Sequence, residues 1–99
     1  MATQFRKKPL TISAERWTGS NEAVLIAFTG GNFRAVPPEE RADYPNITGS
    51  VFDVLHSTWV GVETGQWVIR GVNGEFYPID ESVLAETYDR LPTEPSEAA

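Results

Sequence analysis

The segment from residue 65 to residue 80 constrains the fold more than any other part of this chain. It places Asn73-Gly74 between two short runs that are rich in β-branched and aromatic residues. An Asn-Gly pair between such runs is the strongest short-range signal for a β-hairpin with a two-residue loop. The sequence therefore predicts a hairpin that reverses direction at residues 73 and 74.

This two-residue loop fixes which residues face one another across the hairpin. It places Arg70 opposite Tyr77 and diagonal to Glu75. Directly opposed side chains point to the same side of a sheet. The face expected to form core carries Trp67, Ile69 and Phe76. The other face carries Val68, Arg70, Val72, Glu75, Tyr77 and Ile79.

Arg70, Glu75 and Tyr77 are the strongest candidates for a binding site on this second face. Their expected register makes both guanidinium stacking and an ion pair available. One interpretation is a cross-strand cluster that only stabilises the sheet. The other is a site in which Arg70 and an aromatic ring surround a small planar anion such as a nucleotide.

Alternation of apolar and polar residues predicts a first strand at residues 9–17. Leu10, Ile12 and Ala14 occupy the face that is expected to be buried. Trp17 falls on the opposite face, which is expected to be wetter. A tryptophan there either packs under a loop or contacts another chain, and the sequence leaves both alternatives open.

Two short helices are expected from the helical spacing of apolar residues. The first covers residues 23–29, with Ser20 as its N-cap and Gly30-Gly31 as its left-handed end. The second covers residues 81–90, with Asp80 as its N-cap.

Further short strands are expected between the helices, at residues 32–36 and 59–63, with an exposed loop over residues 39–50. Residues 51–56 suit either a buried strand or a short helix, and their β-branched and aromatic content favours the strand. With the hairpin, the elements read β-α-β-loop-β-β-β-α.

These elements predict one α+β domain over residues 1–91, a small, twisted, mostly antiparallel sheet with two short helices. A partial barrel is an alternative form of the sheet. Residues 92–99 have nothing to bury and are expected to form a disordered tail. The strand at residues 10–17 is expected at a sheet edge, where pairing with a second copy would give a homodimer or a larger ring.

Composition argues against several functions. The chain has 99 residues and a formal net charge of −6, which disfavours binding to nucleic acid or to an anionic membrane. It has no cysteine, so thiolate catalysis and cysteine-ligated metal sites are excluded. The lack of cysteine also fits a cytoplasmic setting, and no secretion signal or membrane-spanning segment is expected.

No set of residues predicts catalysis, a metal site or a cofactor. His56 is the only histidine, and neither zinc-ligand spacing nor a serine-hydrolase motif accompanies it. The sequence suggests that His56 would pair with Asp53 only if this stretch were helical. The carboxylates of the predicted loop are expected to be solvated; they belong to Glu39, Glu40 and Asp43.

Three motifs occur in a fixed order along the chain. They are Arg6-Lys7-Lys8-Pro9, Ala14-x-x-Trp17-Thr18-Gly19 and Gly65-x-Trp67-x-Ile69-x-Gly71-x-x-Gly74-Glu75-x-Tyr77-Pro78, followed by Tyr88. In order and spacing, residues 5–90 resemble a family of small bacteriophage and prophage proteins. One departure is Thr64-Gly65-Gln66-Trp67, where the family tends to read Pro-Gly-Asp-Trp. The resemblance implies a phage-encoded protein expressed in the bacterial cytoplasm, and it implies no catalytic residue.

The function expected from these observations is that of a non-enzymatic phage accessory protein. It would bind a host protein or a small anionic host metabolite during infection, in host takeover or against a host defence. The alternative is a structural or virion-associated protein whose function is self-assembly. The candidate binding residues are Arg70, Glu75, Tyr77, Trp17 and Trp59.

Overall fold

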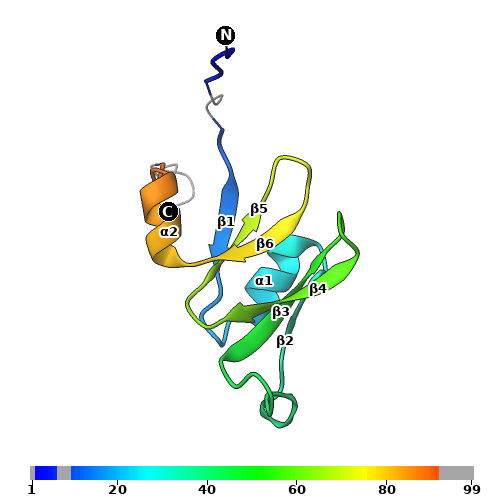
Figure 1. Ribbon diagram of the computed structural model, residues 1–99. Helices are drawn as coiled ribbons and strands as arrows, with labels where there is room; N and C mark the ends of the chain where they lie inside the picture. The colour runs from blue at the N-terminus through cyan, green and yellow to red at the C-terminus, as the bar shows by residue number, and fades with distance from the viewer. Residues whose placement is uncertain (1, 7–9, 92–99) are drawn as a thin grey trace.

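The computed structural model describes residues 2–6 and 10–91 of the chain (Figure 1). The predicted tail at residues 92–99 and part of the Arg6-Lys7-Lys8-Pro9 motif lie outside these residues. The elements are β1 (Ser13–Arg16), α1 (Glu22–Thr29), β2 (Phe33–Ala35), the 3-10 helix η1 (Pro38–Glu40), β3 (Ile47–Asp53), β4 (Thr58–Glu63), β5 (Trp67–Arg70), β6 (Phe76–Ile79) and α2 (Glu81–Thr87). The expected order has three strands after the loop, whereas the structure has four. The loop predicted at residues 39–50 is also shorter, because β3 begins at Ile47.

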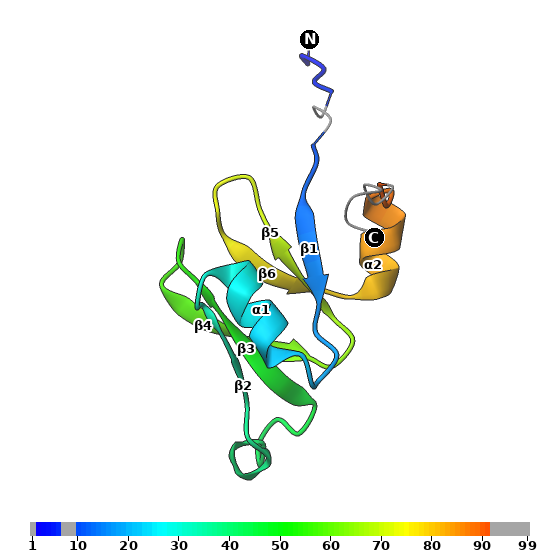
Figure 2. The ribbon, with the colours of Figure 1, turned by 180° about the vertical axis from the view of Figure 1, so that it is seen from behind.

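The strands form two antiparallel sheets, in the orders β1-β5-β6 and β2-β3-β4. The α+β class is confirmed, but two three-stranded sheets replace the single sheet that was expected. Neither sheet closes into a barrel within the described residues. Helix α1 contacts β1 of the first sheet and β2 of the second, so it covers the junction between them (Figure 2).

The core lies between the two sheets and α1. Its buried residues come from every layer and are Trp17, Leu25, Phe33, Val51, Val62, Val68 and Phe76. Trp17 is only 1% exposed, so the prediction that it lies on a wetter face is wrong. The reason is that Glu15 pairs with Val68 and shares its side of the sheet, and this side faces the core.

The predicted hairpin is formed by β5 and β6, but its register differs by one residue from the expected one. Arg70 pairs with Phe76, not with Tyr77. The loop has three residues, since the Gly71 N–H donates to Glu75 O at 2.8 Å and the Gly74 N–H donates to Gly71 O at 3.1 Å. Gly74 has a φ of 80°, as the last residue of a three-residue hairpin loop requires.

This one-residue shift turns the side chains of the hairpin over. Val68, Arg70 and Phe76 point toward the core and α1, whereas Ile69 and Tyr77 share the opposite face. The expected core face of Trp67, Ile69 and Phe76 is therefore wrong. Val68 and Ile69 are nevertheless both fully buried, because both faces of β5 are covered.

The two helices differ from the predicted ones at their ends. Helix α1 has Asn21 at its N-cap position in place of Ser20, and it ends in left-handed Gly30 as expected. Helix α2 follows Asp80 as expected but ends three residues before the predicted end at residue 90, because Tyr88 has an extended backbone. The Asp80 carboxylate accepts a hydrogen bond from Gln66 Nε2 at 2.9 Å and does not cap the helix.

Gly49 provides a test of how closely the two sheets approach. A Cβ at this position would lie 2.7 Å from Phe33 Cζ and 2.9 Å from Trp17 Nε1. We therefore expect Gly49→Ala to lower the free energy of unfolding by about 1–3 kcal/mol through overpacking. Urea denaturation measures this loss, and a variant as stable as the parent protein would contradict the packing described.

Candidate functional site

Arg70, the central residue of the predicted site, lies against α1. Its Cζ atom is 4.6 Å from the centroid of the Phe28 ring and 5.9 Å from that of Phe76. Its Nη2 atom donates a hydrogen bond to Phe28 O. These contacts join β5 to α1, so the geometry favours the interpretation that Arg70 stabilises the fold.

Tyr77 and Glu75 are not brought together with Arg70. Tyr77 lies on the opposite face of the hairpin, where burial raises the pKa of its phenol, with further contributions from Tyr88 and Glu75. The Glu75 carboxylate folds back over Gly71 and accepts a hydrogen bond from the Asn73 N–H at 3.1 Å. The anion pocket that was expected from Arg70, Glu75 and Tyr77 is therefore not assembled.

Trp17 is also removed from the set of residues available to a partner. Its ring packs 4.9 Å from that of Phe33, between centroids, and its Nε1 donates to Thr48 Oγ1 at 2.9 Å. Of the two alternatives for Trp17, packing within the domain is the one observed. Trp59 is the one predicted site residue that is large, apolar and half exposed, at 50%.

Trp59 belongs to a group of apolar side chains on the β3–β4 hairpin. We call this group the apolar hairpin; its members are Phe52, Val54, Leu55 and Trp59. Phe52 is directly opposite Trp59, and their ring centroids are 5.3 Å apart. Both point away from the core, because their neighbours Val51 and Val60 pack against it.

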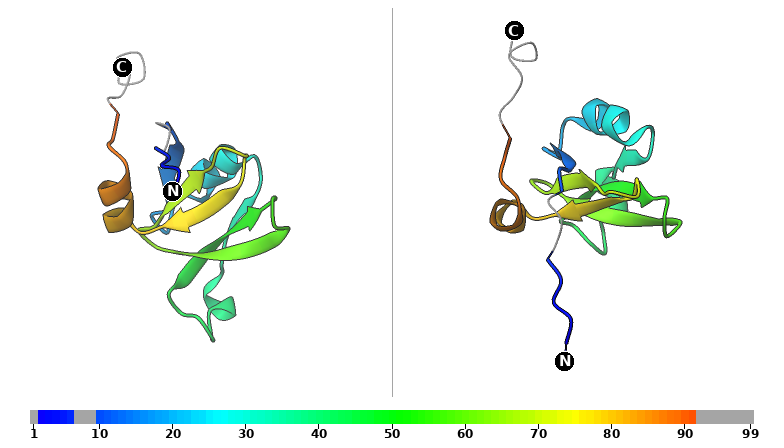
Figure 3. Two further views of the ribbon diagram at one scale, coloured as in Figure 1. Left: turned by 45° about the horizontal axis from the view of Figure 1, so that its top comes forward. Right: turned by 90° about the horizontal axis from the view of Figure 1, so that it is seen from above.

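The apolar hairpin is exposed because no helix among the described residues covers this side of the second sheet (Figure 3). Val54 and Leu55, in the turn, are 47% and 56% exposed. Of the apolar hairpin, only Trp59 was among the candidate binding residues predicted from the sequence. Val54 and Leu55 were missed because residues 51–56 were interpreted as one strand, whereas β3 ends at Asp53.

The turn of the apolar hairpin is held by the Asp53 side chain. Its Oδ1 accepts a hydrogen bond from the Leu55 N–H at 3.0 Å, and its Oδ2 lies 2.6 Å from His56 Nδ1. The pairing with His56 forms in a turn, so the expectation that it needs a helix is wrong. Ser57 completes the turn with a φ of 52°, which is unusual for a residue other than glycine.

These hydrogen bonds change the protonation of Asp53. The hydrogen bond from His56 is the largest cause that lowers the pKa of Asp53, and it outweighs the raising effect of burial. Chemically, the carboxylate acts as a fixed acceptor that orders two successive residues of the turn, Leu55 and His56. Within residues 2–6 and 10–91, no group of three or more His, Asp or Glu side chains is placed to hold a metal ion.

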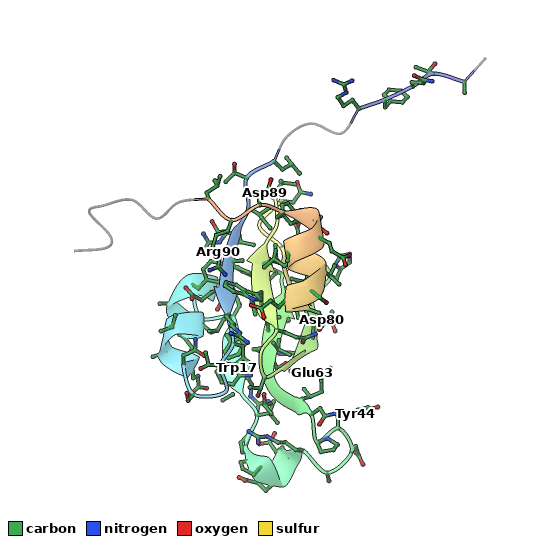
Figure 4. All side chains as sticks on the ribbon, turned by 90° about the vertical axis from the view of Figure 1, so that its left-hand side faces the viewer. Trp17, Tyr44, Glu63, Asp80, Asp89 and Arg90 are labelled. Atoms are coloured by element: carbon green, nitrogen blue, oxygen red, sulfur yellow. The ribbon has the colours of Figure 1, made fainter. Side chains whose placement is uncertain are left out.

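A second surface feature is the β1–α2 groove, an open groove of about 1060 Å³. Trp67 lines it from β5, Ile12 and Ala14 from the β1 side, and Leu84 and Tyr88 from the α2 side. Trp67 Nε1 is buried and has no hydrogen-bond partner. The Arg90 guanidinium lies 5.4 Å from the centroid of the Trp67 ring, and Figure 4 shows Arg90 beside β1.

Comparison of the chain with protein-family models, with curated proteins and with solved structures gives no match. Among the helices of the described residues, none is both long enough and apolar enough to cross a membrane. The geometry of the described residues thus defines a small α+β domain with an exposed apolar hairpin and a groove between β1 and α2.

The role of Arg70 in joining β5 to α1 is tested by substitution. We expect Arg70→Ala to lower the free energy of unfolding by about 1–2 kcal/mol, because it removes the hydrogen bond to Phe28 O and the contact with two rings. Arg70→Lys keeps a cation but not the planar fork, and should lose less. If Arg70→Ala unfolds at the same urea concentration as the parent protein, the assigned role is wrong.

The Asp53 turn predicts a specific dependence of stability on pH. Because the pKa of Asp53 is lowered from 3.8 in the folded state, its stabilisation is complete well above pH 3.8 and is lost as the pH falls through the lowered pKa. Asp53→Asn should therefore be less stable than the parent protein near neutral pH, and the difference should shrink in acid. Asp43→Asn, at an exposed position, is the control. If the stability of both variants depended on pH in the same way, the role assigned to Asp53 in the turn would be wrong.

Proposed function

We propose that this chain is a small phage-encoded accessory protein that binds a protein of the bacterial host cytoplasm, without catalysis. The apolar hairpin is the binding surface. Stoichiometric binding is sufficient for host takeover or for blocking a host defence, since an occupied partner surface is unavailable to its normal ligand. The observation that carries the proposal is the exposure of Trp59, Leu55 and Val54 together on one hairpin.

The composition of the apolar hairpin suits protein recognition. Tryptophan is enriched among the residues that dominate protein–protein binding energy, because it buries a large rigid area on contact. Clustered apolar side chains on a small soluble domain typically mark an interaction surface. Trp59 and Phe52 form the centre of such a surface, with Val54 and Leu55 at its end.

The geometry of the turn lowers the cost of binding. Asp53 holds the backbone at Leu55 and the ring of His56 in one conformation before any partner arrives. A loop that is already ordered loses less conformational entropy on association, so more of the contact energy is retained as affinity.

The charge of the chain indicates which partners it would meet fastest. A net charge of −6 attracts basic surfaces and repels acidic ones at long range. A host protein with a basic rim around an apolar pocket fits both properties. The small anionic metabolite has no comparable support, because Arg70 is engaged with Phe28 and Phe76.

The proposal is tested by capturing partners from lysate of the host bacterium with the parent protein and with two alanine variants. We expect Trp59→Ala to lower affinity for the captured protein about 30-fold or more, which corresponds to loss of a central anchor. Val72→Ala is the matched control, an exposed apolar residue on the other hairpin, and should bind as the parent does. Circular dichroism confirms that both variants remain folded.

Two results would contradict this proposal. One is a partner that binds Trp59→Ala as tightly as the parent protein, which would place the binding surface elsewhere. The other is capture of virion structural proteins alone, which would support the alternative of a virion-associated component. Affinity measured by titration calorimetry, with the purified partner, distinguishes these cases.

A further inference from the structure

The outer edge of β1 has main-chain groups that no other strand of residues 10–91 uses. β1 is the end strand of the sheet β1-β5-β6. The Trp17 N–H donates to Gln66 O at 2.9 Å, which shows that Trp17 directs its main chain toward the β5 side. The main-chain N–H and C=O groups of successive residues in a strand point to alternate sides. Those of Ser13 and Glu15 therefore also point toward β5, and those of Ala14 point away from it.

Arg16 follows this alternation. Its carbonyl oxygen therefore points away from β5, and this oxygen accepts a hydrogen bond from Asn21 Nδ2 at 2.8 Å. The side chain of Asn21 thus satisfies one outward group at the end of β1. No strand within residues 10–91 lies beside Ala14 on this side, and Figure 4 shows β1 between α1 and α2.

The β1–α2 groove lies beside this edge and is partly formed by it. Leu10, Ile12 and Ala14 line the groove from one side, and Leu10 is still 45% exposed. A strand added to the edge would direct alternate side chains toward α2. Those side chains need to be apolar and small enough for the groove, and the sequence of β1 itself has this alternation.

We propose that β1 pairs in antiparallel fashion with β1 of a second copy of this chain, so that two three-stranded sheets become one continuous sheet. An open edge with unpaired main-chain groups is the feature that permits such pairing. The proposal uses the first sheet and leaves the apolar hairpin free. It is therefore independent of the proposed function and survives its failure.

Several registers would bring the outward-pointing main-chain groups of the two β1 strands together, and the charges of the side chains favour one of them. A register centred on Glu15 would oppose the carboxylates of the two copies, which is destabilising. A register centred on Ala14 instead places Glu15 opposite Ser13 of the second copy. In this register the outward N–H and C=O groups of the two Ala14 residues face each other. The repulsion between two chains of net charge −6 is screened beyond about 10 Å at 0.1 M salt, so moderate salt strengthens the pairing.

The register is tested with a single introduced thiol, since the chain has no cysteine. Facing residues of a hydrogen-bonded antiparallel pair have Cα atoms about 5.5 Å apart, which suits a disulfide. Ala14→Cys should therefore form a covalent dimer under mild oxidation, several-fold faster than the control Val72→Cys at the exposed β5–β6 turn. Equal rates for both, or no dimer for Ala14→Cys, would overturn the proposed register.

The pairing itself is tested by sedimentation velocity on the full chain. Ala14→Pro removes an outward N–H that the β1–β5 pairing does not use, and proline is tolerated at such edge positions. We expect the parent protein and Ala14→Ser to dimerise and Ala14→Pro to dimerise about tenfold more weakly or not at all, with unchanged circular dichroism. A parent protein that stays monomeric at high micromolar concentration and moderate salt would overturn the proposal. It would do so even if the edge of β1 bound strands of other proteins.

Discussion

Trp17 joins the two sheets through its main chain and its side chain at once. Its N–H donates to Gln66 O and its carbonyl accepts from the Gly65 N–H, which fixes it to the chain that enters β5. Its indole N–H donates to Thr48 Oγ1 on β3, and its ring fills the space that Gly49 leaves open. The relative placement of the sheets, and with it the outward orientation of Phe52 and Trp59, depends on this one buried residue.

The positions of most elements could be predicted from local patterns, whereas their orientation could not. Asn73-Gly74 correctly placed the hairpin, but the loop length depended on Glu75 folding over Gly71, a side-chain contact that no short-range pattern encodes. The face of β1 was misjudged for a related reason. The sheet is covered by α1 on one side and approached by α2 on the other, so apolar alternation does not distinguish the two faces.

The candidate site was likewise predicted in part by local patterns and in part missed by them. Trp59 was among the candidate binding residues, and it is half exposed in the structure. The Asp53 turn was not identified, because it requires β3 to end at Asp53 and the chain to turn within residues 54–57. Arg70 lies against Phe28 and is not opposite Tyr77, because the register of the hairpin differs by one residue from the expected one.

The attachment of α2 has a consequence for how the domain opens. None of its residues is buried, and it meets the rest of the fold across a groove. Its detachment would uncover Trp67 and the groove side of β5 but would leave the core between the two sheets and α1 in place, so it costs less than unfolding the whole domain. Amide hydrogens of α2 therefore exchange with solvent by local opening, while those of β5, which pairs with β1 on one side and with β6 on the other, exchange only when the whole domain unfolds.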